Sequence, residues 1–177
     1  MDSVQFIAAL AAAVAVTAAF SDVRHRRIPN RLTYSSMGAG FLAQAAFHGW
    51  RGMLSSIEGG LVFGGLFLVF YLIHAMGAGD VKLAAALGLI VGASASLEVM
   101  FATAMAGGAL AIVFMVASGR IVETMRNTWS VAGFHARYGL KAHPVVNLDN
   151  PKAVRMPYGL AFAVGTLYWV ASSQLWR

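Results

Sequence analysis

Long apolar runs constrain the fold of this chain more than any other feature. The first run, residues 4–20, contains no charged side chain. A helix of about 20 apolar residues is what it takes to cross the roughly 30 Å hydrocarbon core of a membrane. Only 11% of all residues are charged, against about 25% in an ordinary soluble domain. Such a chain cannot cover a globular surface with polar groups, and it is far too apolar to be disordered.

The runs predict an all-α, polytopic membrane protein with six transmembrane helices, in a single domain over residues 1–177. The expected spans are residues 4–20, 32–47, 61–76, 83–95, 99–118 and 157–175. Segment 119–156 is the longest polar stretch and is expected to be a cytoplasmic or interfacial loop. In its first half Ile121, Met125 and Trp129 recur every four residues, which is typical of an amphipathic helix on a membrane surface.

The basic residues predict the orientation in the membrane. The formal net charge is +6, and of the 13 lysines and arginines only Arg51 and Arg177 do not follow the first, third or fifth span. Loops rich in lysine and arginine face the cytoplasm. We therefore expect both termini outside the cytoplasm, which in the inner membrane of a bacterium means in the periplasm.

Composition also narrows the chemistry. The chain has no cysteine, which excludes disulfides, zinc–thiolate sites and a thiol nucleophile. We expect neither a metal nor another cofactor. Without a basic patch interleaved with aromatic residues, nucleic-acid binding is not expected either.

Two of the acidic residues stand out by position. Asp22 and Asp80 each follow a long apolar run, and both runs are expected to end at the cytoplasmic face. Two carboxylates brought together can divide the work of hydrolysis: one takes a proton from water while the other, protonated, polarises a carbonyl. Gly77 and Gly79 permit unusual backbone torsions and close approach of an extended substrate beside Asp80.

The residues around these aspartates carry a resemblance to a known family. Two motifs and one short element are similar to those of the bacterial prepilin peptidases, polytopic aspartic proteases of the GxGD type: Asp22-x-Arg24-x-x-x-Ile28-Pro29-Asn30, Gly77-x-Gly79-Asp80-x-Lys82 and Met156-Pro157-Tyr158-Gly159. The resemblance covers nearly the whole chain in order and spacing.

The resemblance implies an activity and its catalytic residues. Such enzymes remove the short basic leader from type IV pilins and pseudopilins at the cytoplasmic membrane face, with Asp22 and Asp80 as the catalytic pair. Many relatives also carry a cysteine-ligated zinc domain and methylate the new N-terminus. Because this chain lacks cysteine, it resembles the short, peptidase-only branch of Flp-type (tight-adherence) pili, and no methyl transfer is expected.

The other motif residues are expected to support the site rather than to react. Arg24 is interpreted as a topology or lipid-headgroup contact, Lys82 as a lysine that reaches toward the membrane surface, and Asn30 as a helix cap. Pro29 is expected to set the turn before the second span. Pro157, Tyr158 and Gly159 form the supporting element before the last span.

Two other interpretations remain open from the residues alone. Ser94, within Gly92-Ala93-Ser94-Ala95, and His48 would suit an intramembrane serine protease. A polytopic assembly or ion-coupled transport protein would also carry carboxylates in its membrane segments. The latter interpretation is disfavoured because both aspartates are expected at one face, with no acid midway to relay a proton.

Overall fold

The computed structural model describes residues 2–139, 141, 144 and 156–175. Over these residues the chain forms five helices: α1 (Ser3–His25), α2 (Asn30–Leu72), α3 (Ala78–Ala117), α4 (Ile121–Tyr138) and α5 (Gly159–Leu175). By length and composition α1, α2 and α3 can cross a membrane, and α5 contains a shorter apolar helix. The predicted all-α membrane class is confirmed. Six separate transmembrane helices are not, because α2 and α3 each cover two of the predicted spans.

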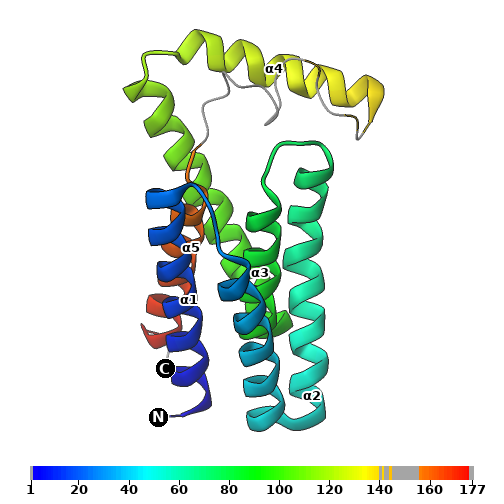
Figure 1. Ribbon diagram of the computed structural model, residues 1–177, viewed down its shortest axis with the longest axis vertical. Coiled ribbons are helices and arrows are strands. Elements are labelled where there is room, and N and C mark those ends of the chain that lie inside the picture. Colours follow the sequence, from blue (N-terminus) through cyan, green and yellow to red (C-terminus); the bar gives the residue numbers. More distant parts are fainter. Residues whose placement is uncertain (1, 140, 142–143, 145–155, 176–177) are drawn as a thin grey trace.

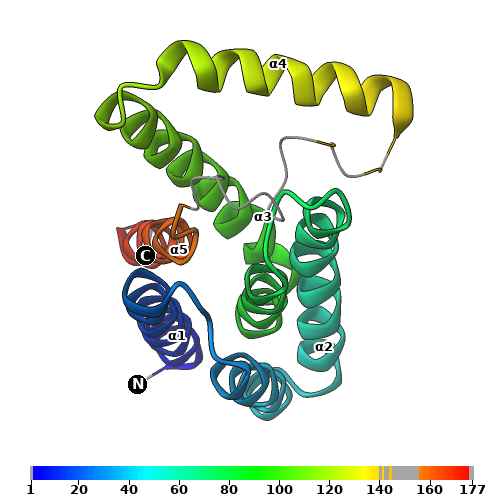
Figure 2. The same cartoon turned by 45° about the horizontal axis from the view of Figure 1, so that its top comes forward.

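The chain turns back on itself within α2 and again within α3 (Figure 1). Gly49 (φ 59°, ψ −141°) and Gly92 (φ 78°, ψ 175°) interrupt the helical backbone there. Positive φ is readily adopted only by glycine. As a result, α1 begins and α5 ends at one end of the bundle, called here the N-terminal end. Helix α4 lies across the opposite end, the α4 end (Figures 1 and 2).

Side chains of α2 satisfy the backbone groups that the break at Gly92 leaves without helical partners. Such groups are costly in a membrane, where no water can replace the lost hydrogen bonds. Three hydrogen bonds serve this purpose: Gln44 Nε2 donates to the Ile90 carbonyl (2.8 Å), Ser56 Oγ donates to the Leu89 carbonyl (2.7 Å), and the Ala93 N–H donates to Ser55 Oγ (3.0 Å). The two folded-back helices are therefore locked together at their turns.

Small residues let the helices approach closely. The buried face of α1 carries a stripe of alanines spaced three or four apart, Ala8, Ala11, Ala15 and Ala18, and this helix packs against α5 and α3. Between α2 and α3, Gly59 and Gly88 lie backbone to backbone, so that a Cβ on either would overlap the other. Since lipid supplies no hydrophobic drive between helices, such close packing stabilises the bundle.

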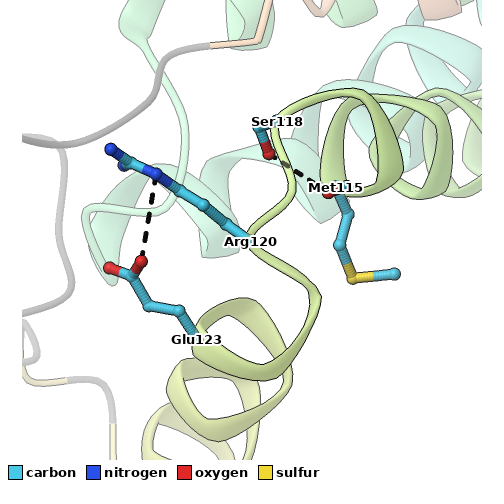
Figure 3. Close-up of polar contacts among 4 residues, drawn as sticks. All are labelled: Met115, Ser118, Arg120 and Glu123. Atoms are coloured by element: carbon cyan, nitrogen blue, oxygen red, sulfur yellow. Dashed lines mark hydrogen bonds and ion pairs between the residues drawn. The ribbon is translucent and has the colours of Figure 1, made fainter.

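Helix α4 is joined to α3 by a tight turn (Figure 3). Gly119 is left-handed (φ 67°) and the Arg120 N–H donates to the Met115 carbonyl, the pattern of a Schellman turn. Ser118 Oγ also donates to that carbonyl (3.1 Å), and an exposed Arg120–Glu123 ion pair (3.9 Å) follows. Such surface pairs contribute little, so the turn itself sets where α4 begins.

The helix predicted in the first half of segment 119–156 is therefore present. No side chain of α4 is buried, and Val122 and Trp129 are 82% and 73% exposed. Among the described elements, α4 contacts only α3. Its contact with a membrane surface stays a prediction, and residues 140, 142–143 and 145–155 lie outside the described residues.

We predict that Gly88→Ala destabilises the bundle, because the new methyl group overlaps the backbone of Gly59 and overpacking typically costs about 1–3 kcal/mol. Gly65→Ala is the matched control, since a Cβ there meets nothing within 4 Å. Thermal unfolding in detergent should show a lower midpoint for Gly88→Ala alone. An unchanged midpoint would mean that the α2–α3 contact tolerates an extra carbon.

Candidate active site

Four helix ends meet at the α4 end of the bundle (Figures 1 and 2). They are the C-terminal end of α1 and the N-terminal ends of α2, α3 and α5. Asp22 lies in the last turn of α1 and Asp80 in the first turn of α3. The fold thus brings together two carboxylates that are far apart in the sequence.

Asp22 lies on the buried face of α1. It continues the alanine stripe at the helical spacing, four residues after Ala18, and only 9% of it is exposed. The backbone N–H of Gly159 donates to Asp22 Oδ2 at 2.8 Å. Because Gly159 is the first residue of α5, the carboxylate sits where the helix presents free N–H groups and the positive end of its dipole.

Only glycine fits at position 159 in this arrangement. A Cβ there would lie 2.9 Å from Asp22 Cβ and 3.1 Å from Asp22 Oδ2. A larger residue would push the start of α5 away from α1. The backbone donor to Asp22 therefore depends on the missing side chain.

Asp80 is held by its own helix. Its Oδ2 accepts the N–H of Gly77, which caps α3, at 3.2 Å, as the third residue of a helix does in a capping box. The side chain is partly buried, and Asp22 is near enough for the two charges to interact. Each carboxylate is thus oriented by a backbone N–H at the α4 end.

Tyr158 packs against the aromatic core and lies close to the two aspartates. Its ring packs against Phe67 and Phe162, with centroids 6.0 Å and 5.7 Å away. The Asp80 carboxylate is near enough to interact with the Tyr158 phenol. The next residue, Gly159, binds Asp22.

Gly107 of α3 makes room for the Tyr158 ring. A Cβ at this position would lie 2.5 Å from Tyr158 Oη and 2.8 Å from Cζ. The sequence interpretation did not select Gly107. The adjacent glycines 107 and 108 inside an apolar run were the available signal, but only the structure shows that the first of them faces a tyrosine.

The two aspartate motifs also touch each other directly. Ile28 packs against Gly79, where a Cβ would lie 3.4 Å from Ile28 Cβ. Lys82 Nζ donates to Asn30 Oδ1 at 2.9 Å and lies 5.2 Å from the centroid of the Tyr34 ring. These contacts tie the start of α3 to the start of α2.

One interpretation of a supporting residue was therefore wrong. Asn30 does not cap α2, because Pro29 occupies the cap position without a side-chain hydrogen bond, and the Asn30 amide binds Lys82 instead. That Lys82 reaches toward the membrane surface stays a prediction. Arg24 is exposed in the last turn of α1, where a cation complements the helix dipole. Pro157 is buried just before α5, a favourable place for proline at a helix start.

These features define a helical membrane protein with two carboxylates, each oriented by a backbone N–H, at one end of its bundle. Comparison with known families agrees with this class. Residues 9–112, more than half of the chain, match the type IV leader peptidase family. The chain belongs to this family, and its membership makes the protein a membrane peptidase that acts on prepilins.

The matched range includes most of α1, all of α2 and most of α3, and therefore both aspartates and the Asn30–Lys82 contact. It ends before α5, so the contact of Gly159 with Asp22 is known from the geometry alone. No curated protein and no solved structure matches the chain.

We predict that Lys82→Met slows prepilin cleavage, because it removes the bond to Asn30 that holds the start of α3 near α2. Misplacing a reacting group by a fraction of an ångström to 1 Å costs roughly tenfold to a hundredfold in rate. Lys141→Met, at an exposed position, is the matched control. Initial rates on a prepilin in detergent measure both, and Asn30→Asp, which still accepts from Lys82, should cleave normally. Equal rates for Lys82→Met and wild type would show that cleavage does not depend on Lys82.

We also predict that Gly107→Ala reduces cleavage while Gly108→Ala does not. The first adds a methyl group against the Tyr158 hydroxyl and ring, whereas a Cβ at Gly108 meets nothing within 4 Å. The same rate assay, with membrane levels checked by immunoblot, compares these adjacent substitutions. If both variants were equally active, Tyr158 would not need its present position.

Proposed function

We propose that this protein is an aspartic endopeptidase that uses Asp22 and Asp80 to remove the leader from Flp-type prepilins and pseudopilins. One observation supports this proposal most strongly. At the α4 end, each of the two carboxylates accepts a backbone N–H, and their charges interact. Such a pair can share the proton transfers of peptide hydrolysis without a metal or a thiol.

In the proposed reaction one carboxylate removes a proton from water, and the oxygen of that water attacks the scissile carbonyl carbon. The other carboxyl group donates its proton to the carbonyl oxygen. The tetrahedral intermediate then breaks its C–N bond, the leaving amine takes up a proton from the first carboxyl group, and one hydroxyl of the intermediate returns a proton to the second carboxylate. Because a close pair titrates as a unit, the two roles are not assigned to individual aspartates.

Tyr158 and Gly159 are proposed as positioning residues. Gly159 holds Asp22 through its N–H, and Tyr158 lies near Asp80. Gly77 and Gly79 themselves add no side chain beside Asp80. An extended substrate backbone is proposed to approach the carboxylates here, with Pro29 and Pro157 setting the turns on either side.

The proposed arrangement in the membrane follows from charge and from the folded-back helices. Each arm of α2 and α3 is taken as one crossing, which with α1 and α5 gives six. The α4 end then faces the cytoplasm, because the basic residues cluster there, and both termini lie in the periplasm of a bacterial inner membrane. A prepilin presents its basic leader and cleavage site at the same surface. The absence of cysteine supports assignment to the peptidase-only branch without methyl transfer.

The transport alternative is not favoured. Asp22 and Asp80 lie at one end of the bundle, whereas a proton pathway needs ionisable groups along the membrane normal. The family match also points to proteolysis rather than transport.

The proposal predicts that Asp22→Asn and Asp80→Asn each abolish cleavage of a co-expressed Flp-type prepilin, because asparagine keeps the size and removes the ionisable group. The loss of the leader is read as a mass shift of the pilin, and the membrane level of each variant is measured alongside. Ser94→Ala is the control for a serine mechanism and should cleave like wild type.

Cleavage by both asparagine variants at the wild-type rate would refute the aspartic mechanism. If Ser94→Ala were inactive and both aspartate variants were active, Ser94 and not the aspartate pair would carry out the cleavage. A methyl group on the mature pilin N-terminus, seen as an additional mass of about one CH₂, would contradict the peptidase-only assignment.

A further inference from the structure

A second polar site lies at the N-terminal end of the bundle, away from the aspartates. It is a cavity of about 340 Å³ between α1, the turns of α2 and α3, and α5. Apolar residues including Ile7, Val91 and Trp169 form part of its lining, and polar side chains line the rest: Gln44, His48, Arg51, Ser55 and Ser94. Nothing in the proposed peptidase reaction uses these residues.

Hydrogen bonds fix the orientation of the polar side chains at this cavity. Gln44 Nε2 donates to the Ile90 carbonyl, so its Oε1 must accept. His48 Nδ1 lies 3.0 Å from that Oε1 and therefore carries the proton. The remaining ring nitrogen, Nε2, is then an acceptor and does not donate to an anionic ligand. In the same way Ser55 Oγ accepts the Ala93 N–H, which leaves its hydroxyl proton available.

Arg51 adds a full positive charge to this set of donors. Its side chain is exposed at the rim, and within the described part of the chain it has no hydrogen bond or ion pair. None of the residues that line the cavity is acidic. A guanidinium is well suited to a phosphate group, which it binds through two parallel hydrogen bonds.

We propose that this cavity binds a phosphate group, with Arg51 as its main contact and the hydroxyl groups of Ser55 and Ser94 as hydrogen-bond donors. The apolar residues beside these donors suit the glycerol and upper acyl chain of an anionic phospholipid, and free phosphate offers the same recognised group. The site is separate from the aspartates and does not depend on the proposed peptidase mechanism.

Native mass spectrometry of the full-length protein in detergent tests this site. Phosphatidylglycerol and zwitterionic phosphatidylcholine are added to wild type, Arg51→Gln and Ser94→Leu. The first variant removes the charge, and the second fills the rim while leaving Arg51 in place. Arg120→Gln, an exposed arginine at the other end of the bundle, is the matched control. A second arm adds inorganic phosphate as a competitor.

We expect wild type and Arg120→Gln to retain phosphatidylglycerol over phosphatidylcholine, and Arg51→Gln and Ser94→Leu to lose roughly tenfold in affinity, the usual size of a lost charge-assisted hydrogen bond. Displacement by inorganic phosphate would identify the phosphate group alone as the ligand, whereas retention would identify the lipid. Equal lipid retention by Arg51→Gln and wild type would overturn the proposal. Loss in Arg51→Gln with full binding in Ser94→Leu would do so too, since the arginine would then bind lipid outside the cavity.

Discussion

Close contact between helix backbones is the constraint on which the rest of this structure depends. Within a membrane, helices gain little from hiding apolar side chains from one another, and they associate through tight packing and internal hydrogen bonds. The alanine stripe of α1 and the opposed Gly59 and Gly88 provide that packing. The turns at Gly49 and Gly92 then arrange the arms of α2 and α3, with the polar side chains of α2 replacing the lost helical hydrogen bonds of α3.

The candidate site also depends on close contact with the helix backbone. Asp22 and Asp80 are each oriented by a main-chain N–H, from Gly159 and Gly77, rather than by basic side chains. A main-chain donor is fixed by the helix that carries it, so the carboxylates are held as rigidly as the helices themselves. At position 159 the missing Cβ is what permits the close approach of α5 to Asp22.

The class of fold and the placement of Asp22 and Asp80 at one end of the bundle could be predicted from sequence, because they depend on composition and on linear spacing. Apolar runs identify membrane helices, and basic loops indicate which ends share a face. Contacts between segments that are far apart in the sequence leave no comparable pattern in it. The bond from Lys82 to Asn30 was missed because each residue was interpreted on its own helix. The role of Gly107 was missed because a glycine pair in an apolar run does not reveal which ring it faces.

The two folded-back helices also differ from prediction for a physical reason. Each turn is so short that helical hydrogen bonding resumes almost at once after a single glycine. The sequence shows the polar residues around such turns, such as His48 and Arg51, but not that one residue suffices to reverse the chain. The third and fifth predicted spans therefore began too late.

The bond between Gly159 and Asp22 joins residues 137 positions apart. A ribosome makes the chain from its N-terminus, so Asp22 enters the membrane long before its partner Gly159 exists. Until the last helix inserts, Asp22 lacks its main-chain donor and Tyr158 is absent from the core. The order of synthesis thus makes assembly of the site the final step of biogenesis, and an incomplete chain in the membrane would not yet have the geometry described for the finished protein.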